Sequence, residues 1–117
     1  MVRIGTVVLH VHDVHRAARF WTGALGYSVR DGEIGDQSPV LVAPDGDGPS
    51  ITLDEADATH LDLIAADRSE QRSEVERLVA LGARRVPWSY PDGADHVVLA
   101  DPEGNLFCVV ADSGGAG

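Results

Sequence analysis

The sequence predicts an α+β fold of two tandem βαβββ modules, with helices outside a curved mixed sheet that surrounds a cleft. The first observation is an internal repeat: residues 6–29 and 60–86 each follow a strand–helix pattern in which Leu-Gly, at 25–26 and 81–82, comes after the helix. The second is that similar turns, APDG at 43–46 and ADPEG at 100–104, come before later strand-like segments. We expect module one at about 3–57 and module two at about 58–112, in one domain of residues 1–112 with a flexible tail at 113–117.

In module one, residues 6–11 alternate between two faces, which is the two-residue period of a strand. Asp13 is a suitable helix N-cap, and Gly26 is a suitable residue for ending the helix. Between them apolar residues recur at helical spacing, which predicts an amphipathic helix that covers the sheet: Val14, Ala17, Ala18, Trp21, Ala24 and Leu25.

Module two repeats this plan, with alternation over residues 60–65 and a helix from about Ser69 to Gly82. This helix is expected to turn Val75, Leu78 and Val79 inward. Residues 36–54 and 95–111 are expected to supply the remaining strands, joined by turns at PDGDGP and DPEGN.

Composition excludes several kinds of function. The formal net charge of -10 disfavours binding to nucleic acids and anionic membranes. All nine basic residues are arginine, so no lysine is available for Schiff-base or phosphate-loop chemistry. Cys108 is the single cysteine, and there is no secretory signal or apolar stretch long enough to span a bilayer. We therefore expect a cytoplasmic protein.

The segments VVLHVHDVHRAARFWTGALGYSV, HLDL, LVALGA and VVLADPEGNLFCVV resemble the vicinal oxygen chelate superfamily. That superfamily includes glyoxalases, bleomycin resistance proteins and extradiol dioxygenases, and the last segment is similar to the closing strand of its glyoxalase-like subgroup. The resemblance implies paired βαβββ modules, a homodimer and, in the enzymes, a divalent metal ion held by four inward side chains.

The resemblance places those four ligand positions at Thr6, Thr52, His60 and Cys108. Threonine hydroxyls bind cations weakly, and a Cys-His pair leaves the coordination shell incomplete. We therefore expect no metal cofactor. A rearranged set of ligands remains an alternative: His10, Asp54, His60 and Cys108.

His60, His10 and Asp62 are the candidate catalytic residues, because a histidine beside a carboxylate can transfer protons near neutral pH. The competing interpretation is that His60 and Asp62 only form hydrogen bonds with each other or within the sheet, as buried polar groups do. His12 and His15 are expected to face solvent.

The predicted ligand contacts combine inward polar groups with the aromatic residues of the 87–91 segment. Cys108 is more simply a small buried apolar residue than a nucleophile. For Trp88 and Tyr90, packing against the protein is as good an interpretation as contact with a ligand. The predicted set is Thr6, Thr52, Asp54, Trp88, Tyr90 and Cys108.

The leading hypothesis is a glyoxalase-like protein that binds a small organic molecule in the cleft between the modules, or a metal-independent enzyme acting there. Catalysis is left open; an enzyme would be a lyase or isomerase working by His/Asp proton transfer. One alternative is a metal-dependent lyase, isomerase or dioxygenase with rearranged ligands. The other is a drug-sequestering antibiotic resistance protein, with which the acidic charge agrees.

Overall fold

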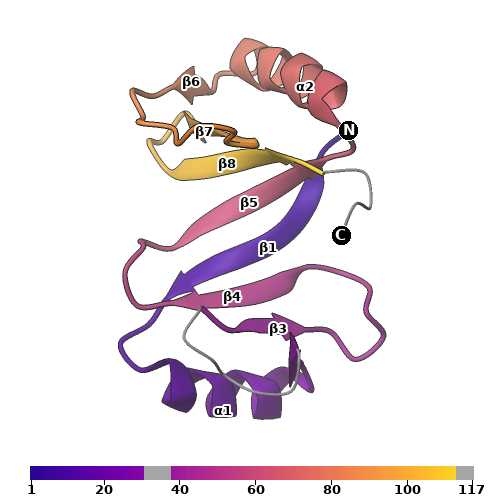
Figure 1. The fold of residues 1–117 in the computed structure, drawn as a ribbon, viewed down its shortest axis with the longest axis vertical. Coiled ribbons are helices and arrows are strands. Elements are labelled where there is room, and N and C mark those ends of the chain that lie inside the picture. The colour runs from indigo at the N-terminus through magenta and orange to yellow at the C-terminus, as the bar shows by residue number, and fades with distance from the viewer. Residues whose placement is uncertain (31–37, 113–117) are drawn as a thin grey trace. The chain divides into compact units, whose positions relative to one another are not determined.

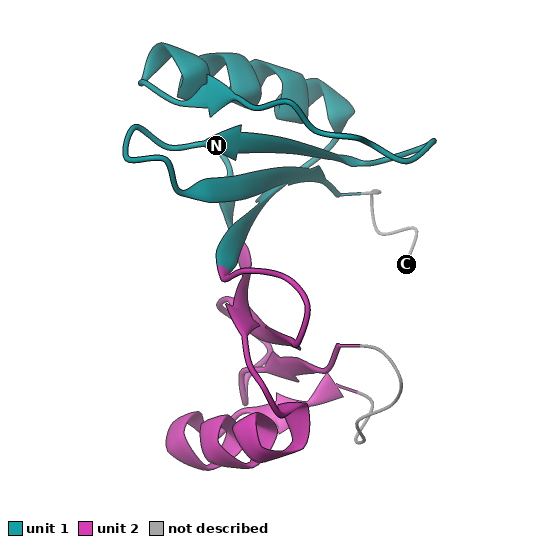
Figure 2. Ribbon diagram, turned by 90° about the vertical axis from the view of Figure 1, so that its left-hand side faces the viewer, with its two compact units in different colours: residues 1–4, 60–117 teal, residues 5–59 magenta. Residues whose placement is uncertain are grey.

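The computed structural model describes residues 1–30 and 38–112, and all its helices and strands except β2 are labelled in Figure 1. The described chain divides into two compact units, residues 5–59 and residues 1–4 with 60–117, coloured separately in Figure 2. The tail expected at 113–117 lies outside the described residues, as do the first two residues of the expected 36–54 strand region. In the described ranges no helix is long and apolar enough to cross a membrane.

The unit of residues 5–59 contains most of module one. Its elements are β1 (Arg3–His10) without that strand's first two residues, α1 (Val14–Leu25), β2 (Ser28–Val29), β3 (Val40–Val42) and β4 (Ser50–Asp54). The strands are ordered β2-β3-β4-β1, with β1 parallel to β4 and the other pairs antiparallel. One face of this sheet is covered by α1 (Figure 1).

Helix α1 forms where the sequence predicts it. The Asp13 side chain accepts hydrogen bonds from the backbone N–H groups of His15 and Arg16, so the predicted N-cap is confirmed. Gly26 ends the helix with φ 72°, a left-handed conformation that favours glycine. The helix buries Ala18 against Leu41 and Leu53.

The second unit contains β5 (His60–Ala65), α2 (Arg68–Ala80), β6 (Arg84–Arg85), β7 (His96–Ala100) and β8 (Leu106–Ala111). Its strands are ordered β5-β8-β7-β6, with β5 parallel to β8 and the other pairs antiparallel. Each unit therefore has the βαβββ plan, and the α+β fold class is confirmed.

Helix α2 packs on the sheet of its unit through Val75, which lies in a core with Ala65, Leu99 and Val109. It also buries two polar residues, Gln71 and Glu74. Gln71 Nε2 donates to the carbonyls of Asp95 and Val109 at 2.9 and 2.8 Å. Buried polar groups are tolerated when they are hydrogen-bonded in this way.

The last turn of each helix differs from the prediction. Leu25 is 44% exposed, Val79 is 39% exposed and Ala24 is exposed as well, so the expectation that these three residues pack inward is wrong. All three lie in the last turn of their helix, and none of them is among the residues of the two apolar cores. Helix α2 also begins one residue before Ser69, because Asp67 supplies the N-cap by accepting from Glu70 N–H.

Candidate functional site

A group of polar side chains lies on one face of the β5-β8-β7 sheet. Ala65 on β5 and Val109 on β8 belong to the core beneath α2. Because strand side chains alternate between faces, His60, Asp62 and Cys108 lie on the opposite face, away from α2. Asp62 is directly opposite Cys108 in the parallel register of β5 and β8, which brings the two side chains together.

The three side chains form a compact cluster, which we call the His60 cluster. His60 Nε2 lies 3.4 Å from Asp62 Oδ1, and the two side chains are 20% and 26% exposed. One donor atom from each of His60, Asp62 and Cys108 lies within 4.8 Å of the others. The sequence prediction grouped His60 and Cys108 as ligand positions and Asp62 as a catalytic partner; the structure places all three in one group.

This arrangement can support two kinds of chemistry. A carboxylate 3.4 Å from an imidazole can hold the ring in position, and a positioned imidazole is a common proton-transfer group. Nitrogen, sulfur and oxygen donors within 4.8 Å of one another are also close enough to share one metal ion, and these donor types suit zinc.

Thr6 and Thr52, the other two positions suggested by the resemblance, lie in the unit of residues 5–59. Their hydroxyl oxygens are 3.0 Å apart, and Thr6 Oγ1 also lies 3.0 Å from the carbonyl oxygen of Ser50, to which it donates. These hydroxyls are occupied by hydrogen bonds to each other and to the sheet, and neither carries a charge.

His10 and Asp54 stabilise local structure in the same unit. His10 Nδ1 lies 3.0 Å from the Asp57 carbonyl oxygen. The Asp54 carboxylate accepts from the backbone N–H groups of Asp57 and Ala56 and from the Ser38 hydroxyl, and these bonds lower the pKa of Asp54. Asp54 therefore closes the turn after β4, a role that sequence reasoning did not assign to it.

The aromatic residues of the 87–91 segment lie in the irregular stretch before β7, as predicted. Trp88 is 50% exposed and Tyr90 is 42% exposed. Tyr90 accepts a hydrogen bond from Val98 N–H at 2.8 Å and makes an edge contact with His96 at 5.3 Å. Val98 is the β7 partner of Cys108, so the Tyr90 hydroxyl is anchored to the strand adjoining the His60 cluster.

Sequence reasoning did not single out His96, although its place at the start of β7 puts it on the same face as Val98. His12 and His15 are exposed, which confirms that prediction.

Two units with the same βαβββ plan define the class of fold found in the vicinal oxygen chelate superfamily. Residues 6–110 match the family described as Glyoxalase-like domain, and the chain belongs to that family. No curated protein matches the chain.

Solved structures share the fold at low sequence identity. A glyoxalase/bleomycin resistance protein/dioxygenase superfamily member from Vibrio splendidus 12B01 is 18% identical, with TM-score 0.61 and coverage of 96% of this chain and 99% of that one. A Streptomyces coelicolor methylmalonyl-CoA epimerase variant in complex with 2-nitronate-propionyl-CoA is 18% identical, with TM-score 0.62 and coverage of 97% and 99%. The Mn(II)-bound glyoxalase from Novosphingobium aromaticivorans is 19% identical, with TM-score 0.58 and coverage of 96% of this chain but 40% of that one.

Proposed function

We propose that this protein binds a small organic molecule on the sheet face that carries the His60 cluster, and that His60 transfers a proton to or from that molecule. The observation that carries the proposal is the 3.4 Å separation of His60 Nε2 and Asp62 Oδ1 on one partly exposed face. The protein would then be an isomerase or lyase of the glyoxalase-like family.

The two residues have different roles in this proposal. His60 accepts a proton from an acidic C–H or O–H group of the ligand, because imidazole exchanges protons near neutral pH. Asp62 holds the ring in position and stabilises the imidazolium that forms, since opposite charges at this distance attract. Cys108 lies beside them and offers a small, polarisable contact to the ligand.

The fold is compatible with this class of reaction. One structure with the same fold is an epimerase bound to an acyl-CoA analogue. Acyl thioesters and 2-oxo acids, whose carbonyl groups acidify a neighbouring C–H bond, are therefore suitable first probes. Contacts to the ligand from Thr6, Thr52, His10, Asp54, Trp88 and Tyr90 remain predictions, as do the homodimer and the cytoplasmic location.

The test is hydrogen–deuterium exchange at carbon, followed by NMR in heavy water with propionyl-CoA, methylmalonyl-CoA and a panel of 2-oxo acids. We expect the protein to catalyse exchange in one of the two probe classes, the acyl-CoA thioesters or the 2-oxo acids. His60→Gln should slow this exchange by about 100-fold, which is the lower end of the rate loss expected when a general base is removed. Asp62→Asn should have a smaller effect. His15→Gln, which alters an exposed histidine, is the matched control and should not change the rate.

Two outcomes would contradict the proposal. Exchange that persists in His60→Gln would remove the proton-transfer role. Tight binding of cationic drugs without exchange in any probe would instead support the sequestering alternative, with which the net charge of -10 agrees.

A divalent metal ion is the second candidate, because the donor atoms of the His60 cluster lie close enough together to share one. His60, Asp62 and Cys108 would hold it, and their nitrogen and sulfur donors suit zinc better than manganese. Such an ion supplies Lewis-acid polarisation of a bound carbonyl group.

Cobalt(II) titration tests this candidate without any activity measurement. Binding at the His60 cluster would give a thiolate-to-cobalt charge-transfer band that Cys108→Ala abolishes and His15→Gln retains. Absence of the band in the unsubstituted protein would exclude Cys108 as a metal ligand.

A further inference from the structure

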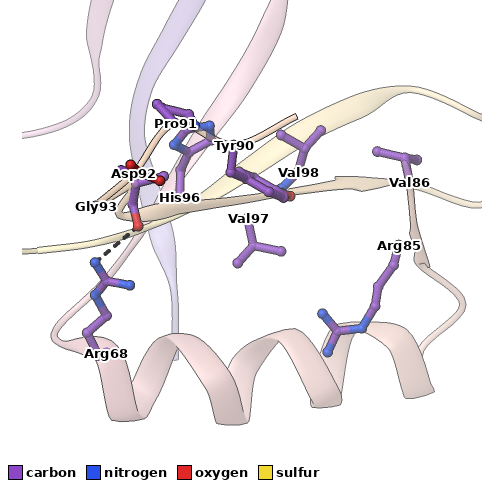
Figure 3. A pocket seen from close by; sticks show the side chains of 11 residues that line it. Arg68, Arg85, Val86, Tyr90, Pro91, Asp92, Gly93, His96, Val97 and Val98 are labelled. Carbon is purple, nitrogen blue, oxygen red and sulfur yellow. Dashed lines mark hydrogen bonds between the residues drawn. The ribbon is translucent and has the colours of Figure 1, made fainter. Parts of the chain in front are cut away.

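A pocket separate from the His60 cluster lies at the edge of the unit that contains β5 to β8, between the start of α2, the end of β6 and the start of β7 (Figure 3). Its volume is about 570 Å³, within the range of pockets that hold small organic ligands. Its lining combines an apolar surface that includes Val97 with the side chains of Arg68, Arg85, Tyr90, Asp92 and His96.

The charge of this pocket is opposite in sign to that of the whole chain. Two of the nine arginines line it with one carboxylate, that of Asp92, whereas the formal net charge of the protein is -10. Within the described part of the chain, no carboxylate lies within ion-pairing distance of Arg68 or Arg85. An unpaired guanidinium beside an apolar surface is a common way to bind a carboxylate or phosphate.

Several of the polar groups are held in place by the protein. Arg68 Nη2 donates to the Ala94 carbonyl at 3.1 Å, which fixes the guanidinium at one end of the pocket. A guanidinium has five N–H donors, so this bond leaves others to meet a ligand. Tyr90 accepts from Val98 N–H, which leaves its own O–H proton to be donated.

We propose that this pocket binds an organic anion, with an apolar body lying against Val97 and an anionic group paired with Arg85 or Arg68. Figure 3 shows the two arginines entering from opposite ends of the pocket, so a ligand with two anionic groups would engage both. Carboxylates and phosphates share this chemistry. The site goes beyond the proton-transfer function proposed above and does not depend on it.

The test is NMR titration of the unsubstituted protein with benzoate, benzamide, acetate and inorganic phosphate, observing the backbone of residues 85–98 and the arginine side chains. Benzamide matches benzoate without the charge, and acetate carries the charge without the apolar ring. We expect benzoate to shift these signals, benzamide not to, and acetate to bind more weakly than benzoate. A stronger response to phosphate than to benzoate would identify phosphate esters as the ligand class.

Substitution of the arginine that pairs with the anion, either Arg85→Gln or Arg68→Gln, should weaken binding of the preferred anion by roughly tenfold, the effect of one charge-assisted hydrogen bond. Arg72→Gln is the matched control, because Arg72 is exposed on the same helix and does not line the pocket. Three results would overturn the proposal: no shift with any anion, equal shifts with benzoate and benzamide, or equal weakening by Arg72→Gln.

Discussion

Replacing Gln71 with leucine tests how α2 is attached to its sheet. Gln71 is 3% exposed and donates to two backbone carbonyls, those of Asp95 and Val109. Leucine keeps most of the side-chain volume but donates no hydrogen bond. The substitution therefore isolates the polar contribution of one buried amide.

The expected loss follows from the two hydrogen bonds. At about 1 kcal/mol each, their removal lowers the free energy of unfolding by about 2 kcal/mol. The Asp95 carbonyl retains its hydrogen bond from Ala111 N–H, which keeps the loss below the full penalty for two unsatisfied groups. At about 4 °C per kcal/mol for a chain of this size, Tm falls by about 8 °C.

Thermal unfolding followed by circular dichroism measures this change. Arg72→Leu is the matched control: its side chain is exposed, and we expect a change within about 0.5 kcal/mol. Gln71→Glu should destabilise more than Gln71→Leu, because it buries a carboxylate facing two carbonyl oxygens. Equal Tm values for Gln71→Leu and Arg72→Leu would show that the two hydrogen bonds of Gln71 do not stabilise the fold.

Two further predictions concern backbone conformation and charge. Gly82→Ala should lower the free energy of unfolding by about 1–3 kcal/mol, because φ is 122° and a Cβ there would lie 3.2 Å from Pro102 Cγ. Gly23→Ala should raise the free energy of unfolding by about 0.5–1 kcal/mol, because Gly23 lies in α1 and a Cβ there would have no atom within 4 Å. Urea unfolding measures both changes, and a Gly82→Ala protein more stable than the Gly23→Ala protein would contradict this prediction. Hydrogen bonds from Arg77 and Val2 N–H lower the pKa of Glu74 from 4.5 to about 2. The stabilisation that ionised Glu74 gives to the fold is therefore complete above pH 4.5 and is lost as pH falls toward 2. The difference in free energy of unfolding between the unsubstituted protein and Glu74→Gln should shrink over that pH range. A difference that stays constant there would rule out the charged contact.

Local sequence signals predicted the elements that depend on short-range chemistry. Asp13 and Gly26 bound α1 as expected because capping depends on residues within one turn. The alternation over residues 60–65 correctly placed His60 and Asp62 on one face, since strand side chains repeat every two residues.

Interactions between distant segments could not be read from the sequence. Gln71 and Glu74 are polar residues of a largely polar helix, which normally indicates a solvent-facing position, yet both are buried and are hydrogen-bonded to residues far along the chain. The grouping of Asp62 with Cys108 depends on the parallel register of β5 and β8, which no local pattern specifies. The pocket lined by Arg68 and Arg85 likewise forms only when α2, β6 and β7 assemble.

The most direct test of the proposed function is a crystal structure of the protein with whichever probe undergoes exchange at carbon. We expect the exchanging carbon to lie about 3–3.5 Å from a ring nitrogen of His60, the separation of reacting atoms poised for transfer. Density for the ligand that makes no contact with His60, or a fully coordinated metal ion occupying the His60 cluster, would contradict it.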